Sequence, residues 1–216
     1  VPKGYRIRDI DDLESTLERV GYPAVIKPLD GNHGKGATIG IVSLEDAAVA
    51  FEKAKEYSRW VIVEQQLIGA DFRALVVNNR LIAVAKRIPA HIVGDGKSTI
   101  TELVEETNRD PRRGFGHENV LTLIDIDQQS MRLIQNAGYT VDSVLKRGEA
   151  FFLKTTANIS TGGTAIDVTD EVHPENVFLF ERIARIIGLD VAGIDVIADN
   201  VAQPLRDVRG GIIEVN

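Results

Sequence analysis

The segment KPLDGNHGKG, which follows the apolar run AVI, places lysines and glycines where they could bind a phosphate. Backbone N–H groups of glycine-rich turns donate to phosphate oxygens, and a lysine supplies positive charge. The segment is not a P-loop, because Gly36 stands where that motif needs serine or threonine. It is not the dinucleotide fingerprint either, because ATIGIV, which follows, favours a strand over a helix. Two interpretations remain open: a hairpin that closes over a triphosphate, or an ordinary exposed hairpin.

A second candidate site lies near the end of the chain, where GIDVIAD and GIIEVN are expected to be strands. Glu214 and Asn216 are two residues apart and therefore project from the same face of a strand. Asp195 projects away from its apolar neighbours, so the three side chains converge if the two strands are adjacent. Two carboxylates and an amide oxygen suit Mg²⁺, which usually shares its ligands with phosphates. Alternatively, both acids lie on the exposed face of an amphipathic hairpin.

A third segment, VIVEQQLIGADFR, could contact a nucleotide. An apolar strand runs into Glu64, then Leu67, then Asp71. The backbone at such a strand end can bind an adenine edge, and a carboxylate shortly afterwards can accept hydrogen bonds from ribose hydroxyls. Read alone, the segment favours the simpler interpretation of a strand-to-turn junction with a solvated acid.

A fourth segment, ANISTGGT, combines small polar residues with two glycines. Asn158, Ser160 and Thr161 precede Gly162 and Gly163, a composition typical of a nest of backbone N–H groups that binds anions. The alternative is a tight turn without a ligand.

Helices and strands alternate along the chain around these segments. Three segments have helical periodicity: DIDDLESTLERVG, with Leu13, Leu17 and Val20 on one face, SLEDAAVAFEKAKEY and HPENVFLFERIARIIG. Ser43, with Asp46 three residues later, is expected to cap the second helix, and Pro174 stands in the first turn of the third. FRALVV and RLIAVAKRI flank an Asn78-Asn79 turn as in a hairpin. Residues 109–122 are expected to be an exposed loop. The pattern predicts an α+β fold with mixed or antiparallel sheets. We expect residues 1–66 to form a smaller lobe that carries the glycine-rich loop of residues 30–36, called the flap below. Residues 67–216 are expected to form a larger lobe that carries the metal site.

Composition excludes several classes of protein. The 216 residues are 44% hydrophobic, enough for a buried core, and the net charge of −7 argues against nucleic-acid binding. Cysteine is absent, which excludes disulfides and thiolate chemistry and fits a cytoplasmic protein. No apolar run reaches the roughly 18 residues of a membrane span, so no membrane partner is expected. The first residue, Val1, and the strand-like end suggest a fragment of a longer protein.

In this order, the four segments resemble the ATP-grasp superfamily, and the resemblance covers essentially the whole chain. More narrowly, KPLDGNHGKG, KRIPAHIVGDGKSTITELVEETNRDPRRG, TANISTGGTAIDVTDEVHPEN and GIDVIAD…GGIIEVN are similar to the ATP-grasp domains of the cyanophycin synthetase family. The resemblance implies an ATP-grasp fold in which two α+β lobes clasp the nucleotide.

The resemblance also implies a reaction that uses ATP and Mg²⁺. A carboxylate attacks the γ-phosphate to give an acyl phosphate, and an amine then displaces phosphate to form an amide. In this family the domain is expected to add L-aspartate to the C-terminus of the poly-aspartate backbone of cyanophycin. Two alternatives are a glutathione-synthetase-like ligase, which shares the PA-x-x-x-GDG-x-STI pattern, and a non-catalytic nucleotide-binding module. The parent protein is expected to be a homo-oligomer.

The family motifs assign a nucleotide-binding set of residues. Lys27 and the flap would contact the phosphates, the segment after the strand would hold adenine, and an acid would bind the ribose. The set consists of Lys27, Gly31, His33, Gly34, Lys35, Gly36, Glu64, Gln65, Leu67 and Asp71. The family's second nucleotide-binding lysine lies upstream of this chain, so the fragment alone could be inactive.

The remaining assignments concern the metal and the reacting groups. The magnesium ligands would be Asp195, Glu214 and Asn216, and the residues that stabilise the acyl phosphate or bind the attacked carboxylate would be Arg73, Arg87, Asn158, Ser160, Gly162 and Gly163. The basic cluster RDPRR, residues 109–113, either belongs to a solvated loop or steers an anionic poly-aspartate chain.

Overall fold

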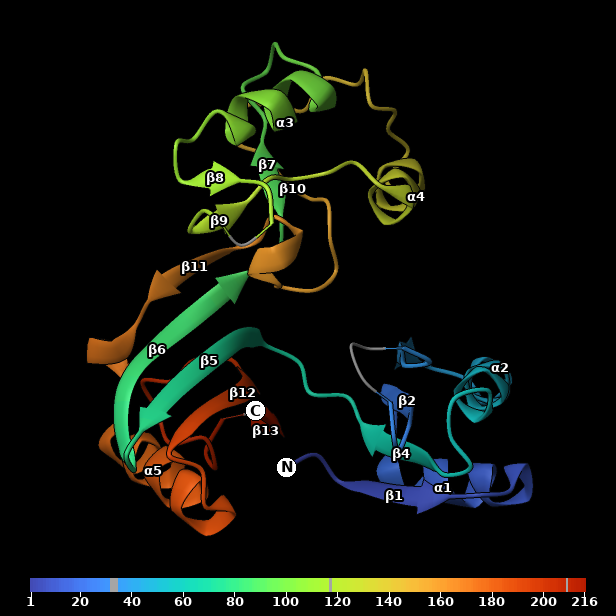
Figure 1. The fold of residues 1–216 in the computed structure, drawn as a ribbon. Coiled ribbons are helices and arrows are strands. Elements are labelled where there is room, and N and C mark those ends of the chain that lie inside the picture. Colours follow the sequence, from blue (N-terminus) through green and yellow to red (C-terminus); the bar gives the residue numbers. More distant parts are fainter. Residues whose placement is uncertain (32–34, 117, 209) are drawn as a thin grey trace. The chain divides into compact units, whose positions relative to one another are not determined.

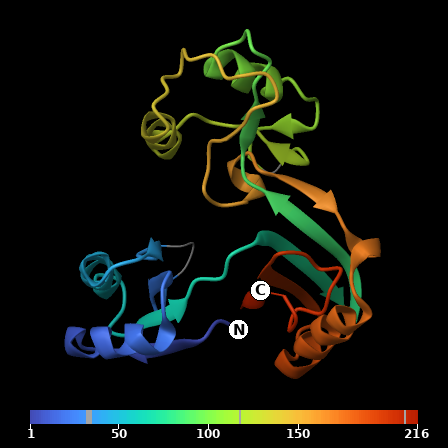
Figure 2. The same ribbon diagram turned by 180° about the vertical axis from the view of Figure 1, so that it is seen from behind.

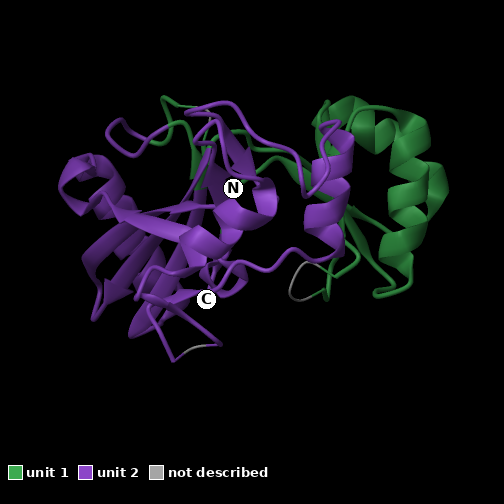
Figure 3. Cartoon of the chain, turned by 90° about the horizontal axis from the view of Figure 1, so that it is seen from above, with its two compact units in different colours: residues 1–69, 197–199, 205–213 green, residues 70–196, 200–204, 214–216 purple. Residues whose placement is uncertain are grey.

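A computed structural model describes residues 1–31, 35–116, 118–208 and 210–216, in which helices and strands alternate (Figure 1, and from behind in Figure 2). The chain folds into two compact units. Unit 1 comprises residues 1–69, 197–199 and 205–213, and unit 2 comprises residues 70–196, 200–204 and 214–216 (Figure 3). The sequence analysis placed one boundary between residues 66 and 67, whereas segments near the end of the chain belong to both units.

Unit 1 is an antiparallel sheet with two helices packed on it (Figure 1). The strand order is β1-β4-β2-β3. The bounds are β1 Gly4–Ile7, α1 Leu13–Val20, β2 Ala24–Pro28, β3 Thr38–Ile41, α2 Leu44–Lys55 and β4 Val61–Gln65. Helix α1 buries Leu13, Leu17 and Val20, the face that its periodicity predicts. Helix α2 begins at the predicted cap, where the Ser43 side chain accepts a hydrogen bond from the Asp46 amide.

Unit 2 contains a larger sheet with the strand order β11-β6-β5-β12-β13. Its strands are β5 Ala70–Val77, β6 Arg80–Ile88, β11 Thr164–Asp167, β12 Val191–Ala198 and β13 Gly211–Val215. Asn78 and Asn79 both have positive φ, at 49° and 60°, and form the predicted hairpin turn between β5 and β6. Helix α5, Pro174–Ile187, begins at the expected proline and packs against β5 and β6 (Figure 1).

The rest of unit 2 surrounds a separate hydrophobic core that includes Ile92, Ile100, Ile134, Leu145 and Leu153. The elements there are β7 His91–Val93, α3 Ile100–Asn108, β8 Arg113–Gly114, β9 Leu121–Thr122, α4 Gln128–Asn136 and β10 Ala150–Phe152. Short 3₁₀ turns cover Ile10–Asp12, Ile159–Thr161 and Thr169–Glu171. Antiparallel pairing dominates, which confirms the predicted α+β class. Within the described residues, no helix is long and apolar enough to cross a membrane.

One prediction about the fold is wrong. Residues 109–122 do not form a uniformly exposed loop, because β8 and β9 pair in parallel and bury Arg113 and Leu121. The Arg113 Nη1 donates to the carbonyl oxygens of Thr122 (2.7 Å) and Gly162 (3.0 Å), so a polar-looking segment is held against the core. Sequence polarity alone does not reveal such bonds to distant carbonyls.

The capping box at the start of α3 gives a test of local stability. The Thr99 hydroxyl accepts from the Glu102 amide (3.2 Å), and the Glu102 carboxylate accepts from the Thr99 amide (2.8 Å). We expect Thr99→Ala to lower the free energy of unfolding by about 1 kcal/mol. Thr156→Ala, at an exposed position, should change it by less than about 0.5 kcal/mol. Denaturant unfolding checks both, and equal effects would contradict the assignment of the cap.

Candidate functional site

In unit 1, the candidate site is built on the less buried face of the sheet. Lys27 on β2 and Glu64 on β4 point away from the core, opposite to Ile26 and Val63. The two strands are paired, and the Lys27 ammonium lies 2.6 Å from the Glu64 carboxylate. Lys27 therefore lies on the face of the sheet opposite to the core. Glu64, which the sequence analysis assigned to the adenine segment, is the ion-pair partner of that lysine.

The described part of the flap shows why glycine is needed there. Gly36 has a φ of 73°, and a Cβ would lie 2.6 Å from the Tyr57 ring. A Cβ on Gly31 would lie 2.5 Å from the Pro28 ring. Lys35 is exposed. Two predicted phosphate contacts, His33 and Gly34, lie outside the described residues.

The predicted adenine segment continues β4 into the connection to β5. Gln65 is exposed, and its amide donates to the Lys3 carbonyl (2.8 Å). Leu67 is half-buried and lies against Gly211, where a Cβ would meet the Leu67 methyl group at 2.8 Å. The Gln66 amide also donates to the Pro23 carbonyl (2.9 Å), so two backbone hydrogen bonds hold the start of this connection.

In unit 2, four charged side chains form one network across three adjacent strands. Asp71 and Arg73 lie on β5, Arg87 on β6 and Asp195 on β12. Arg87 bridges the two carboxylates, with Nη2 lying 2.6 Å from Asp71 and 3.2 Å from Asp195. Arg73 donates through Nη2 to Asp195 Oδ2 (3.0 Å), and its Nε is ion-paired with Asp195 Oδ1. The network unites the two predicted catalytic arginines with the predicted ribose and metal ligands.

Burial sets the electrostatics of this network. The Asp195 side chain is only 7% exposed, so it needs its two guanidinium partners. Burial raises the pKa of Asp71 above its usual range, although the neighbouring Arg87 partly offsets this by lowering it. Gly193 on the same strand leaves room for the network, because a Cβ there would lie 2.7 Å from the Arg73 guanidinium.

The predicted metal ligands share one face of β12 and β13. Gly193 and Asn216 exchange two backbone hydrogen bonds, and an unbroken antiparallel register places Glu214 opposite Asp195. Both Asp195 oxygens are engaged by arginines, Oδ1 by the Nε of Arg73 and Oδ2 by Arg73 and Arg87, and Glu214 is exposed beside them. Two neighbouring carboxylates are ligands that a hard cation accepts, and Asp195 would have to share its oxygens between the ion and the arginines. Among the described residues, no group of three or more His, Cys, Asp or Glu side chains that could hold a metal ion is found, here or elsewhere.

The predicted anion nest is a 3₁₀ turn whose amides are partly used. Asn158 is the residue before the turn, and its carbonyl accepts from the amides of Thr161 and Gly163. The Gly162 amide donates to Ile159. Ser160 is exposed at the centre of the turn. Any anion contact would therefore come from the Ser160 hydroxyl and the first amides of the turn rather than from the glycine amides.

Both glycines of the turn are required by close packing. Gly162 has a φ of 90°, and a Cβ would lie 2.8 Å from the Ile124 side chain. A Cβ on Gly163 would lie 2.7 Å from the Asn158 carbonyl oxygen and 2.8 Å from that of Ile88.

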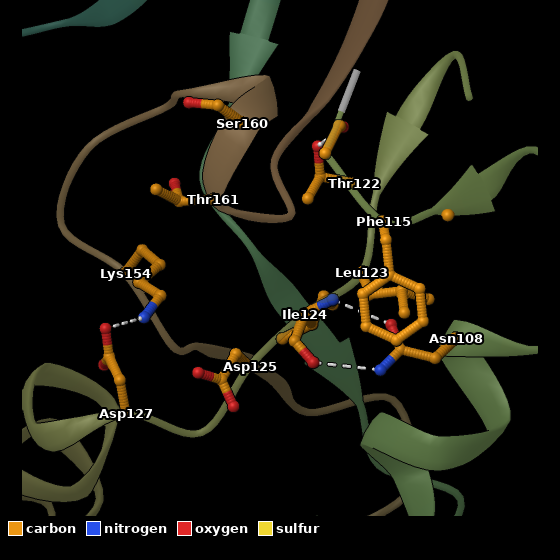
Figure 4. Close-up of a pocket in the computed structure, with 12 residues that line it drawn as sticks. Asn108, Phe115, Thr122, Leu123, Ile124, Asp125, Asp127, Lys154, Ser160 and Thr161 are labelled. Carbon is orange, nitrogen blue, oxygen red and sulfur yellow. Dashed lines mark hydrogen bonds and ion pairs between the residues drawn. The ribbon is translucent and has the colours of Figure 1, made fainter. Parts of the chain in front are cut away.

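A pocket of about 470 Å³ borders this turn, and Ser160 and Thr161 line it (Figure 4). Figure 4 shows an ion pair on its wall between Lys154 and Asp127, with 2.6 Å between the charged atoms. The Lys154 side chain is only 4% exposed. The hydrogen bond to Lys154 lowers the pKa of Asp127 to about 2. Sequence reasoning missed both residues, since a lone lysine after the apolar AFFL shows no motif.

Known proteins share the sequence and the fold of this chain. No protein-family model matches the chain. The chain is 54% identical over its whole length to the cyanophycin synthetase of Trichormus variabilis and covers 24% of that protein. The crystal structure of a bifunctional glutathione synthetase from Pasteurella multocida matches the whole chain with a TM-score of 0.70 and 33% identity, and the chain covers 30% of it.

A more distant structure is the ATP-grasp ligase PsnB, complexed with a phosphomimetic variant of its minimal precursor, Mg and ADP. It matches the whole chain with a TM-score of 0.51 and 16% identity, and the chain covers 44% of it. The chain therefore has the ATP-grasp fold, as predicted. It is homologous over its whole length to cyanophycin synthetases, of whose length it spans about a quarter.

Replacing Asp127 and replacing Lys154 should have unequal effects on the free energy of unfolding. Asp127→Asn leaves a buried ammonium unpaired and should lower the free energy of unfolding by about 3 kcal/mol. Lys154→Met replaces it with an apolar chain and should cost about 1 kcal/mol or less. Denaturant unfolding of both variants measures the difference, and an equal or reversed order would contradict it.

The pH dependence of the same pair follows from the lowered pKa of Asp127. A depressed pKa means that the carboxylate stabilises the fold above its ordinary range near 3.8, and that this contribution disappears as the pH falls towards about 2. The stability difference between the protein and Asp127→Asn should therefore shrink in acid.

Proposed function

We propose that the chain is the ATP-dependent carboxylate–amine ligase domain of a cyanophycin synthetase, and that it adds L-aspartate to the C-terminus of a poly-aspartate backbone. The observation that carries the proposal is the charge network of Asp71, Arg73, Arg87 and Asp195 beside Glu214, found in a chain homologous to cyanophycin synthetases. It combines two guanidinium groups with a carboxylate pair on adjacent strands, the groups that a phosphoryl transfer needs in one place.

The arginines would act on the developing acyl phosphate. A guanidinium matches phosphate geometry with two parallel donors and stays charged at all relevant pH values. Arg73 is about one-third exposed, so it retains donors for a ligand, whereas Arg87 is more deeply buried and positions the carboxylates. Asn158 and Ser160, on the exposed turn, would bind the oxygens of the reacting carboxylate or of the acyl phosphate.

The nucleotide would be held mainly through its phosphates. Lys27 has a fixed ammonium on a strand, and Glu64 sets its direction through the ion pair of 2.6 Å. The glycines at positions 31 and 36 permit the loop geometry that brings backbone close to a triphosphate. Gln65 and Leu67 would flank the adenine, and the Asp71 carboxylate would accept from the ribose hydroxyls.

Asp195, Glu214 and Asn216 would hold Mg²⁺, which would neutralise the charge of the triphosphate. Binding there requires that Asp195 share its oxygens between the ion and the two arginines.

A second candidate function is a ligase that joins γ-glutamylcysteine and glycine. The match to a bifunctional glutathione synthetase, at 33% identity and a TM-score of 0.70, favours it. The higher identity to cyanophycin synthetases favours aspartate.

Mg-ATP binding tests the metal assignment. Saturating Mg-ATP should raise the melting temperature by about 5–10 °C, because it binds only the folded state. Asp195→Asn should remove that shift. Asp190→Asn, an exposed acid just before the same strand, should leave it unchanged. A shift that persists in Asp195→Asn would contradict the role of Asp195.

The two lysines near the flap should differ in importance. Lys27→Met should lower ATP-dependent phosphate release by about a hundredfold, because a fixed charge on the phosphates is lost. Lys35→Met should lower it by less than about fivefold, because Lys35 is exposed in the loop. Steady-state kinetics check both, and the reverse order would overturn the division of roles.

Substrate choice separates the candidate functions. Phosphate release should require L-aspartate together with a poly-aspartate primer. Release with γ-glutamylcysteine and glycine instead would support the glutathione-synthetase alternative. A melting shift with Mg-ATP but no release with either pair would support a non-catalytic nucleotide-binding module.

A further inference from the structure

Arg113 is a buried cation that the proposed reaction does not use. The residue is 9% exposed, and burial lowers the pKa of its guanidinium. Nη1 donates to the carbonyl oxygens of Thr122 and Gly162, whereas Nε is buried and has no hydrogen-bond acceptor. A buried guanidinium bonded only to neutral carbonyls is costly unless a negative charge is brought to it.

The neighbouring carboxylates are already engaged by other arginines. Asp110 is 2.7 Å from the Arg112 guanidinium, and Glu106 is 2.5 Å from that of Arg109. Asp110 affects the pKa of Arg113 only through its charge and forms no ion pair with it. Among the described residues, no carboxylate is ion-paired with Arg113. Within the predicted basic cluster, Arg113 is therefore the member whose positive charge has not been neutralised.

Arg113 lines a cavity of about 670 Å³, which is distinct from the pocket in Figure 4. Most of the cavity wall is apolar, with Ile88, Val93 and Val120 among its residues. Residues 164 to 166 of β11 also line the cavity. Because β11 is the edge strand of its sheet, its outer backbone groups can pair with an added peptide strand.

Arg112 and Glu106 also line the cavity, but each is ion-paired with another side chain, which leaves Arg113 as its unneutralised cation. An apolar wall, this cation and a strand edge suit a peptide with acidic side chains better than a phosphate.

The cavity adjoins the turn that we assign to the acyl phosphate. Ile159 lines this cavity, while Ser160 and Thr161, the next residues, line the pocket in Figure 4. The Arg113 bond to Gly162 fixes the same turn. A peptide in the cavity would thus have its end beside the turn.

We propose that the cavity beside Arg113 binds an acidic peptide segment, with the Arg113 guanidinium as the counter-ion of an aspartate carboxylate. The inference rests on the proposed function, since it identifies the cavity as the place where the acceptor chain is held near the reacting end. In this proposal the residue of the RDPRR segment that contacts the acceptor chain is the buried Arg113. The exposed arginines of the segment are not needed for binding.

Binding of a labelled oligo-aspartate peptide without ATP tests the proposal, with oligo-asparagine as the neutral comparison. The protein should bind oligo-aspartate more tightly than oligo-asparagine. Arg113→Gln should weaken oligo-aspartate binding by about tenfold or more, because a hydrogen-bonded charge pair is lost. Arg109→Gln is the matched control, because it removes an exposed arginine of the same cluster that does not line the cavity. It should change affinity less than twofold.

Arg113 also holds Thr122 and Gly162, so Arg113→Gln could fail to fold. Hydrogen exchange on the unmodified protein then decides. Oligo-aspartate should slow amide exchange in residues 118–122 and 159–166, and oligo-asparagine should not. Unchanged exchange in both segments would overturn the proposal, as would a folded Arg113→Gln variant that binds like the unmodified protein, or an equal loss in Arg109→Gln.

The test of the acidic-peptide site can fail or succeed independently of the test of the ligase reaction. If oligo-aspartate binding depends on Arg113 but no ATP-dependent phosphate release occurs, the acidic-peptide site stands and the proposed reaction falls. If phosphate release with aspartate occurs but binding is independent of Arg113, the reaction stands and the peptide site falls.

Discussion

The buried carboxylate of Asp195 is the constraint on which the larger site depends. A charge that is 7% exposed within an apolar strand is tolerated only because Arg73 and Arg87 reach it from neighbouring strands. The adjacency of β6, β5 and β12 brings these groups together, Gly193 leaves room for the Arg73 guanidinium, and Arg87 links Asp71 to the same network. The arrangement is rigid because each charge limits where the next can lie.

In unit 1, too, a partly buried charge has a partner of opposite charge. Lys27 and Glu64 neutralise each other on the less buried face of an otherwise apolar sheet. The Lys154–Asp127 pair does so beside the pocket in Figure 4. Arg113 departs from the rule, since it is buried without a carboxylate partner among the described residues. The other buried charges in the described part of the chain, Lys154 and Asp195, have partners of opposite charge, so the exception indicates the position of a ligand group.

Much of the fold could be predicted because its signals are local. Helix α1 follows from apolar spacing, the Asn78-Asn79 hairpin from turn chemistry, and the start of α2 from the Ser43 cap. The resemblance of the ordered segments also identified the ATP-grasp fold, which the structural matches confirm. The side-chain partners could not be predicted, because Arg73 and Asp195 are 122 positions apart in the sequence. Long-range pairing depends on strand order, which periodicity does not specify.

Polar segments were the other source of error. The sequence analysis treated residues 109–122 as an exposed loop because the segment is rich in polar residues and glycine. Arg113 is nevertheless buried, and it donates to two carbonyl oxygens. The turn at Asn158–Gly163 was predicted from its composition, but its glycine amides are consumed by bonds within the turn. Composition identified where an anion could bind and did not identify which atoms would bind it.

The acyl phosphate is the central feature of the proposed chemistry, and isotope transfer tests it most directly. A poly-aspartate primer whose terminal carboxylate carries labelled oxygen would be incubated with the protein, ATP, Mg²⁺ and L-aspartate. Attack of that carboxylate on the γ-phosphate predicts that the released inorganic phosphate contains one labelled oxygen atom for each amide bond formed. Amide formation with unlabelled phosphate would contradict the mechanism.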